Sequence, residues 1–143
     1  MGMTVRSAGE SDVAALLRLA EELIPGEAEP KQRECLLRSC IDDAKHDLYV
    51  AELEGRVIGF LDLWTFPDFV HGGVLTIIQN LVVDGAFRGR GVGDLLVRRA
   101  VRRAGERGAL ELHVWTEFDN KAAIRLYKKH GLTGESLLLE REF

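Results

Sequence analysis

The feature that most constrains the fold is an apolar run that leads into a glycine-rich turn and then an amphipathic stretch. Residues 74–83, VLTIIQNLVV, are nearly all apolar, as is typical of a strand buried on both faces. The turn that follows, FRGRGVGD, places Gly89, Gly91 and Gly93 at alternate positions. Apolar residues then recur at helical spacing to about residue 106. This succession predicts a strand–turn–helix unit of a mixed α/β fold.

Periodicity and turn signals predict the remaining elements. In chain order they are a strand (3–8), a helix with Ser11 as its N-cap, a helix beginning near Pro30, a hairpin (47–64) turning at Glu54 and Gly55, a loop (66–73), a strand (109–115), a helix (120–130) closed by Gly131, and a last strand (135–143). The predicted order is βααββ-β-α-β-α-β. We therefore expect a mixed sheet in one domain, residues 1–143, with a parallel crossover between the strands that flank the glycine turn.

Composition narrows the class of protein. The net charge of −4 provides no overall positive field for nucleic acid. No apolar run is long enough to span a membrane, and no leader sequence is recognisable. Cys35 and Cys40 lack the spacing of a zinc pair, and we expect them to be buried thiols in a reducing compartment. The expectation is a soluble cytoplasmic protein.

The glycine turn is predicted to bind an anion. A helix N-terminus that follows a glycine turn directs free amide N–H groups outward, and Arg88 and Arg90 add positive charge. The spacing does not match a dinucleotide-binding loop, because Asp94 stands where the third glycine should be, and the lysine of a Walker loop is absent. The alternative is a tight turn whose glycines serve packing.

Two blocks of the chain resemble the GNAT superfamily of acyl-CoA-dependent N-acyltransferases. The family's loop pattern, [QR]-x-x-G-x-[GA], is present as Arg88, Gly91 and Gly93 after the lead-in NLVVDGAF. Residues 120–132, NKAAIRLYKKHGL, are similar to the family's N-x-x-A-x-x-x-Y block, and VRSAGESDVAALLRLA resembles its opening strand and helix. The likeness covers nearly the whole chain in the expected order.

The resemblance implies that acetyl-CoA, without a metal, lies where strands 74–83 and 109–115 splay apart. Backbone amides near Leu81 and Val83 would hydrogen-bond the pantetheine arm and the thioester carbonyl. Asn120 would contact the arm, or else cap its helix. Tyr127, two helical turns from Asn120, would hydrogen-bond or protonate the departing thiolate, or else serve packing. The full predicted cofactor site is Leu81, Val82, Val83, Arg88, Gly89, Arg90, Gly91, Val92, Gly93, Asp94, Asn120 and Tyr127.

The general base is not evident from the sequence. Family members often carry Glu or His on the strand before the loop, but alternation from Leu81 gives Gln79 and Ile77 here, and neither titrates. His113 is one candidate. The preferred hypothesis is a water relay to His71 or to one of the glutamates near the first helix-to-helix connection, which are Glu21, Glu22, Glu27 and Glu29.

The sequence therefore predicts an N-acetyltransferase in which a primary amine attacks the thioester directly. The acceptor would be a small cationic amine or a protein or peptide amine. One alternative is a catalytically silent acyl-CoA sensor. Another is a nucleotide- or RNA-binding module built on Arg98, Arg99, Arg102 and Arg103, although these also fit a solvated helix face. The apolar run of residues 137–139, on a strand with a free edge, predicts a homodimer.

Overall fold

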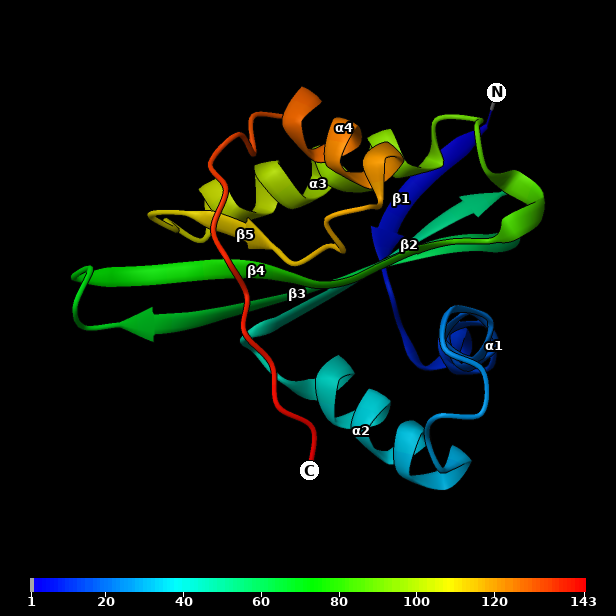
Figure 1. The fold of residues 1–143 in the computed structure, drawn as a ribbon. Helices are drawn as coiled ribbons and strands as arrows, with labels where there is room; N and C mark the ends of the chain where they lie inside the picture. Colours follow the sequence, from blue (N-terminus) through cyan, green and yellow to red (C-terminus); the bar gives the residue numbers. More distant parts are fainter. Residues whose placement is uncertain (1) are drawn as a thin grey trace.

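A five-stranded mixed sheet forms the centre of the protein in the computed structural model, which describes residues 2–143 (Figure 1). The strands lie side by side in chain order: β1 (Met3–Ser7), β2 (His46–Leu53), β3 (Arg56–Asp68), β4 (Gly73–Val83) and β5 (Leu112–Val114). The helices are η1 (Glu10–Asp12), α1 (Val13–Leu23), α2 (Pro30–Asp42), η2 (Gly85–Phe87), α3 (Val92–Glu106) and α4 (Lys121–Lys129). Neighbouring strands are antiparallel except β4 and β5, so α3 is the crossover of a parallel pair.

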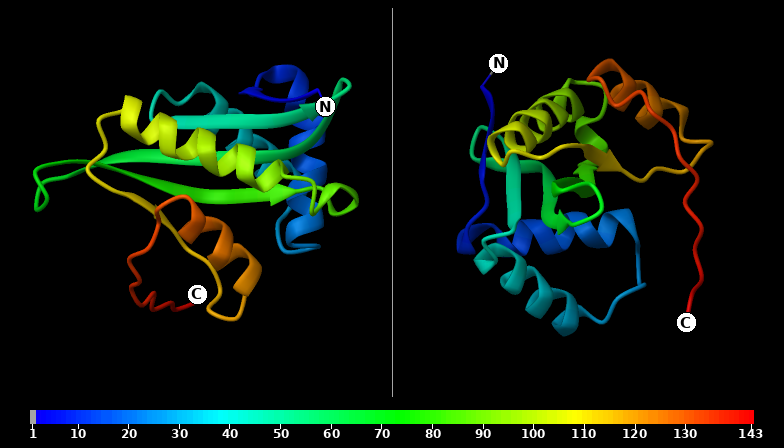
Figure 2. Two further views of the ribbon diagram at one scale, coloured as in Figure 1. Left: turned by 90° about the horizontal axis from the view of Figure 1, so that it is seen from above. Right: turned by 90° about the vertical axis from the view of Figure 1, so that its left-hand side faces the viewer.

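The helices cover the two faces of the sheet in separate layers (Figure 2). On one face, Leu16 and Leu19 of α1 pack in a cluster with Phe60 and Val82 from the strands. On the other face, α3 and α4 pack in a second cluster, which includes Leu61, Ile78, Leu96, Val97 and Tyr127. Because successive strand side chains point to opposite faces, each apolar strand contributes to both clusters. The sheet therefore has a face toward α1 and α2 and a face toward α3 and α4.

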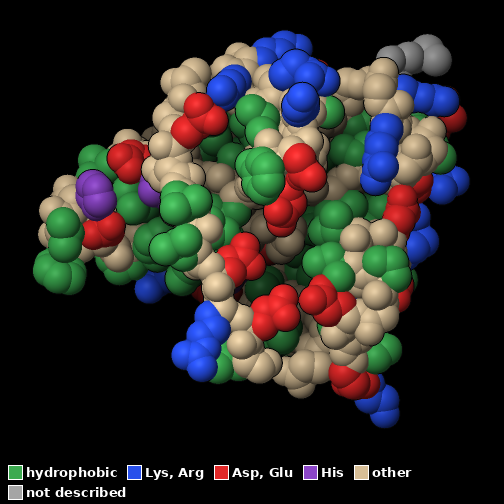
Figure 3. Space-filling view, viewed as in Figure 1, with side chains coloured by type: hydrophobic (Ala, Val, Ile, Leu, Met, Phe, Trp, Pro, Cys, Tyr) green, Lys and Arg blue, Asp and Glu red, His purple; other side chains and the backbone are tan. Residues whose placement is uncertain are grey.

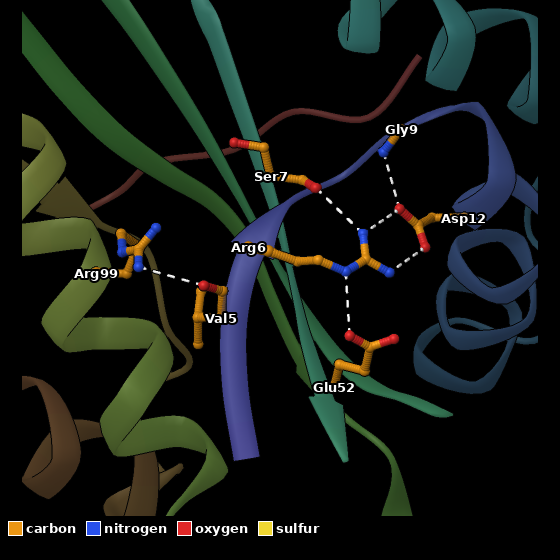
Figure 4. Close-up of polar contacts among 7 residues, drawn as sticks. All are labelled: Val5, Arg6, Ser7, Gly9, Asp12, Glu52 and Arg99. Atoms are coloured by element: carbon orange, nitrogen blue, oxygen red, sulfur yellow. Dashed lines mark hydrogen bonds and ion pairs between the residues drawn. The ribbon is translucent and has the colours of Figure 1, made fainter. Parts of the chain in front are cut away.

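The entry to α1 differs from the sequence-based expectation. Gly9, and not Ser11, precedes the first helical turn, which is a short 3-10 segment. The Asp12 carboxylate accepts a hydrogen bond from the Gly9 N–H at 2.8 Å and pairs with the guanidinium of Arg6 at 2.9 Å (Figure 4). Arg6 also contacts Glu52 of β2 at 3.2 Å. A buried carboxylate that serves both a backbone N–H and an arginine fixes the turn more firmly than a serine cap would.

The last predicted strand is absent from the described residues. Residues 131–143 follow α4 without joining the sheet, and they run past its β5 side toward α2 (Figure 1). The adjacent strand, β5, has three residues instead of the predicted seven. A sheet stabilises an extended segment only where the segment's backbone N–H and C=O groups form hydrogen bonds with a neighbouring strand. A strand of three residues offers few such groups. Leu137 and Leu139 are consequently 83% and 82% exposed.

Two further expectations were wrong. The predicted loop 66–73 begins too early, because β3 continues to Asp68, where Phe66 pairs with Leu75 of β4. The apolar and aromatic side chains that precede the turn extend the hairpin. Cys35 is exposed and Cys40 is partly buried, so neither thiol is a core residue.

Candidate active site

The parallel pair β4–β5 separates halfway along β4. Pairing ends at Ile78 opposite Val114, and β4 continues for five more residues without a neighbour on that side within residues 2–143. The amide N–H of Asp84 donates to the Ile58 carbonyl of β3 at 2.8 Å. Since amide direction alternates along a strand, the N–H groups of Leu81 and Val83 point away from β3, toward the open edge. This places the two predicted backbone donors on the open side of β4.

A β-bulge in β4 explains why β5 diverges and corrects the predicted side-chain directions. Asp62 of β3 pairs with Asn80, and the next β3 residue, Leu63, pairs with Ile78, so Gln79 has no partner. An extra residue reverses the alternation beyond it. The side-chain directions obtained by counting back from Leu81 are therefore wrong. The side chain of Ile78 points to the same face as that of Leu81, whereas that of Ile77 points to the face of α1 and α2.

The glycine turn forms a cradle between β4 and α3. It borders a cavity of about 220 Å³ lined by Val83, Phe87, Arg88, Gly89, Gly91, Val92, Gly93, Asp94 and Leu126. Gly89 and Gly91 have φ angles of 76° and 86°, and Gly91 caps α3. These left-handed conformations favour glycine strongly.

The polar groups of the turn are free to bind a ligand. Across residues 88–94, no backbone N–H has an acceptor within the described chain. Neither Arg88 nor Arg90 forms an ion pair with any carboxylate of residues 2–143. Arg90 lies over the Phe87 ring, 5.2 Å from its centroid. A row of free amides at a helix N-terminus, flanked by unpaired arginines, fits a pyrophosphate group.

The segment that leads into the turn is held in place by α1. Asp84 is buried, caps η2 by accepting from the Ala86 N–H at 3.0 Å, and contacts Arg18 at 3.1 Å and Arg56 at 3.3 Å. The Ala86 N–H and the two arginines together hold the pKa of Asp84 below its ordinary value. Glu22 accepts a hydrogen bond from the Gly85 N–H at 2.8 Å. The cradle is therefore attached to the opposite helical layer.

Two predicted loop residues connect α3 to α4. Asp94 pairs with Lys129 at 2.9 Å and with His130 at 3.0 Å, and these two groups lower its pKa. A Cβ on Gly93 would lie 3.0 Å from a methyl carbon of Leu126. The carboxylate of Asp94 thus already has partners from α4, and Gly93 permits close packing of the two helices.

The residues predicted from the second block lie on α4. The Asn120 side chain accepts from the Ala123 N–H at 3.2 Å, so it caps the helix, in agreement with the alternative reading. Tyr127 is 9% exposed and belongs to the core cluster on the α3 face. No side-chain hydrogen bond of residues 2–143 involves its hydroxyl, and burial raises its pKa. A tyrosine whose ring is packed and whose hydroxyl is unpaired can donate a hydrogen bond to a ligand.

Most of the predicted candidates for the general base already have hydrogen-bond partners, whereas Glu27 is exposed. His71 contacts Asp68 at 2.8 Å in the β3–β4 turn, and His113 contacts Glu111 at 2.9 Å on β5. Among the glutamates, Glu29 caps α2, Glu21 binds the Gly26 N–H and Arg33, and Glu22 binds the Gly85 N–H. These are structural contacts of loops and caps.

The arginine face of α3 is also engaged internally. Arg103 pairs with Asp47 at 3.0 Å, and Arg102 contacts Glu106 at 3.6 Å. Arg99 lies over the Tyr49 ring and donates to the Val5 carbonyl at 3.3 Å (Figure 4). Three of the four arginines therefore already have partners, which argues against a nucleic-acid surface.

Sequence analysis missed one titratable residue in the centre of the sheet, Asp62. Its Oδ2 accepts from the Asn80 side chain at 3.2 Å, whereas its Oδ1 is buried without any partner in the described chain. Burial raises the pKa of this carboxyl. The available signal was a single acid within the apolar run VIGFLDLW, at a position where alternation predicts a partly buried side chain.

Comparison with known proteins agrees with this geometry. The family model described as "Acetyltransferase (GNAT) family" matches residues 13–132. An uncharacterized N-acetyltransferase of Bacillus subtilis, YhfO, is 30% identical over 90% of this chain and 89% of its own length. The chain spans 37% of a second relative, an uncharacterized N-acetyltransferase of Methanocaldococcus jannaschii, with 32% identity over 84 residues.

A solved structure shares the fold. The aminoglycoside acetyltransferase AAC(6')-Iy, in complex with a bisubstrate analog of CoA and acetylneamine, aligns with a TM-score of 0.86 and 20% identity, over all of this chain and 99% of that one. The family match, the relatives and the fold coincide with the separated strand pair and the glycine cradle. The chain therefore belongs to the GNAT family of N-acetyltransferases.

Proposed function

We propose that this protein transfers the acetyl group of acetyl-CoA to a primary amine, and that the residues of the β4 edge, the glycine cradle and α4 bind the donor. The observation that carries this proposal is two groups of free N–H donors, those of Leu81 and Val83 on the open side of β4 and those of residues 88–94 in the turn. Their positions match a long ligand that has a carbonyl-rich arm and a pyrophosphate. The complex of AAC(6')-Iy with a CoA-derived analog supports the same assignment.

The proposed reaction is a direct attack of the amine nitrogen on the thioester carbon. The Leu81 N–H donates to the thioester oxygen, where negative charge develops as the C–N bond forms. Donors from residues 88–94 and the charges of Arg88 and Arg90 hold the pyrophosphate. As the C–S bond breaks, the Tyr127 hydroxyl donates to the sulfur. The thiol is a fairly good leaving group, so this assistance lowers the barrier without being essential.

A cationic acceptor is favoured by the charge of the accessible face. Asp and Glu side chains gather around a hollow in the face shown in Figure 3, in the region between α4 and α2. The chain as a whole carries a net charge of −4. Such a field attracts an ammonium ion. We infer a small polyamine, an aminoglycoside, or an exposed lysine or N-terminus of a protein as the acceptor class.

The test is a thiol-release assay with acetyl-CoA and a panel of spermidine, neamine and a lysine-containing peptide with a free N-terminus. Release of CoA thiol with at least one amine, together with the acetylated product by mass spectrometry, is expected. Tight acetyl-CoA binding by calorimetry without thiol release from any amine would favour the sensor alternative. Salt-sensitive RNA binding without acetyl-CoA binding would favour the nucleic-acid alternative.

We further propose that the protein is cytoplasmic. Its two cysteines are unpaired, as suits a reducing compartment. None of the helices within residues 2–143 combines the length and apolar character that a membrane crossing requires.

We propose a homodimer, although not for the reason that the sequence suggested. That prediction rested on a last strand with a free edge, and this strand does not form within one chain. What supports it now is the exposed pair Leu137 and Leu139, together with the edge strand β5, to which the tail of a second copy could add a strand. Light scattering at micromolar concentration is expected to give twice the chain mass. The variant Leu137→Asp/Leu139→Asp should give the monomer mass, and a monomeric wild-type protein would contradict the proposal.

A further inference from the structure

We propose that Asp62 is the residue that receives the acceptor amine: its Oδ1 binds the incoming ammonium group and takes the proton that must leave before the nitrogen can attack. The inference rests on the proposed acetyl transfer and adds the base that sequence analysis did not identify. It is carried by the position of Asp62 beside the β4 bulge and by the unmet hydrogen-bonding capacity of its carboxylate.

The position follows from the strand register. Asp62 lies directly opposite Asn80, which immediately precedes Leu81 and its outward N–H. Paired residues on antiparallel strands have Cα atoms about 4.5–5.5 Å apart. The Cα of Asp62 is therefore about one strand spacing from the Cα of Asn80, the residue before the amide proposed to hold the thioester oxygen. That separation suits an amine held between the two groups, directly or through one water molecule.

The side chain points to the face from which the amine would approach. Phe60, two residues earlier, packs with α1, so alternation places Asp62 on the face of α1 and α2. Tyr127 lies in the cluster on the opposite face. The two proposed groups therefore lie on opposite sides of the β4 edge, with Asp62 toward the attacking nitrogen and Tyr127 toward the leaving sulfur.

The carboxylate has no cation of its own. Within residues 2–143, no lysine or arginine forms an ion pair with Asp62, and the one donor to it is the neutral amide of Asn80 at 3.2 Å. Its Oδ1 is the one buried side-chain oxygen of the described residues with no hydrogen-bond partner. A buried acceptor without a partner costs folding free energy. Such a cost is retained where the group has a function, and a cationic ligand would supply the missing donor.

Burial also suits the group to proton transfer. Desolvation raises the pKa of Asp62, so its carboxylate is a stronger base than that of an exposed aspartate. The other titratable groups of this face are one thiol and two histidines that already have hydrogen-bond partners. They are Cys40 on α2, His46 on β2 bound to Asp43 and Gln79, and His113 on β5 bound to Glu111.

The proton balance is complete with groups already named. The ammonium R–NH3⁺ gives one proton to Asp62, and the free electron pair forms the C–N bond. The C–S bond then breaks, and its electron pair stays on sulfur. The second proton lost from the nitrogen neutralises the thiolate through the Tyr127 hydroxyl, and the proton on Asp62 returns to water. The products are the amide R–NH–COCH3, the thiol of CoA and one free proton.

The experiment compares Asp62→Asn with Asp68→Asn, a matched control that removes a carboxylate from the same strand near the β3–β4 turn. Both are assayed with acetyl-CoA and spermidine, neamine or the lysine peptide, whichever the wild-type protein acetylates. At neutral pH we expect kcat/KM for the amine to fall about 10²–10³-fold in Asp62→Asn, since general base catalysis is worth about that much. The control should match the wild type. Acetyl-CoA affinity by calorimetry should be unchanged in both.

The pH profile separates catalysis from a structural effect. The reactive form is a neutral Asp62 beside a free amine. It carries the same number of protons as an ionised Asp62 beside an ammonium, so its population does not change with pH while that pair persists. The wild-type rate therefore stays level up to the pKa of the amine, about 10. Without Asp62 the rate depends on free amine and rises about tenfold per pH unit. The deficit of Asp62→Asn should therefore shrink from neutral to alkaline pH.

The possible outcomes are distinct. A deficit that is equal at neutral and alkaline pH, or full activity of Asp62→Asn, would overturn the role of Asp62. If the wild-type protein binds acetyl-CoA yet acetylates none of the three amines, the proposed function fails first. The thermal midpoint of Asp62→Asn should equal or exceed that of the wild type, because the variant removes a buried carboxylate; a large decrease would indicate a structural residue and contradict the proposal.

Discussion

At the scale of single residues, Tyr127 is the group whose role the environment defines most sharply. Its ring is packed among the core side chains of α3 and β4, so the fold needs the ring, whereas no side-chain hydrogen bond within residues 2–143 involves the hydroxyl. Burial raises its pKa, so the hydroxyl is protonated at neutral pH and able to donate. The ring and the hydroxyl can therefore be tested separately.

Tyr127→Phe should lower kcat by about 10²-fold, the lower end of the range for general acid catalysis, because a thiolate leaves without much assistance. KM for acetyl-CoA and the thermal midpoint should stay close to wild type, since the ring remains and the hydroxyl acts chiefly in the transition state. Steady-state kinetics of thiol release measure both constants. Tyr49→Phe, which removes the hydroxyl of the other buried tyrosine of the same cluster, is the control and should be fully active. Full activity of Tyr127→Phe would assign this tyrosine to packing alone.

At the scale of elements, the glycine turn combines two different requirements that the sequence pattern alone does not separate. Gly91 has a φ of 86° at the start of α3, and a Cβ there would meet no atom within 4 Å. Gly93 has ordinary helical geometry, but its Cβ would press on Leu126. A glycine is thus needed at position 91 because of the left-handed backbone conformation, which directs the amides of the turn. At position 93 a glycine is needed because α3 packs closely against α4.

Gly91→Val should abolish acetyl-CoA binding, because a β-branched residue resists the left-handed conformation and the turn must change to admit it. Calorimetry should detect no binding, and circular dichroism should still show a folded protein. Gly105→Ala is the matched control in the same helix: it has open space around it, and it should stabilise the protein by up to about 1 kcal/mol through helix propensity without altering affinity. Unchanged affinity in Gly91→Val would contradict the assignment of the cradle.

The elements that were predicted correctly are those whose signals are local. Pro30 begins α2, Glu54 and Gly55 turn the β2–β3 hairpin, and Gly131, with a φ of 91°, follows the end of α4. The bulge at Gln79 has no comparable signal, since it depends on the register between β3 and β4. The predicted side-chain directions on β4 were wrong for that reason, because one unpaired residue exchanges the faces of the strand.

At the scale of the whole molecule, a few charged contacts tie the helices to one another and to the sheet. Asp84 and Glu22 attach the cradle to α1, and Asp94 attaches α3 to the end of α4. Arg6 and Asp12 join β1 to the start of α1, and Arg6 also holds Glu52 of β2 (Figure 4). Several of these carboxylates have lowered pKa values, so the stability of the assembly depends on pH.

Asp12 provides the clearest case of that dependence. Its bond with Arg6, opposed by burial and aided by the Gly9 N–H, holds its pKa below the ordinary value. A carboxyl with a lower pKa in the folded state stabilises the protein above the pKa of the unfolded chain, and this contribution is lost as pH falls through the folded value. Asp12→Asn should therefore reduce the free energy of unfolding at neutral pH by about 1–3 kcal/mol, with the lower part of that range expected because Arg6 is 40% exposed.

The same variant should differ little from wild type in strong acid, where both carry an uncharged group at this position. Urea unfolding at neutral pH and again at about pH 2 measures the two differences. Asp42→Asn, which alters an exposed aspartate at the end of α2, is the control and should leave both values unchanged. If Asp12→Asn destabilised the protein equally at both pH values, the contribution of Asp12 would come from the shape of the turn and not from its charge. Because the Arg6–Asp12 contact lies on the far side of β3 from the cradle, acetyl-CoA affinity should stay constant while stability falls.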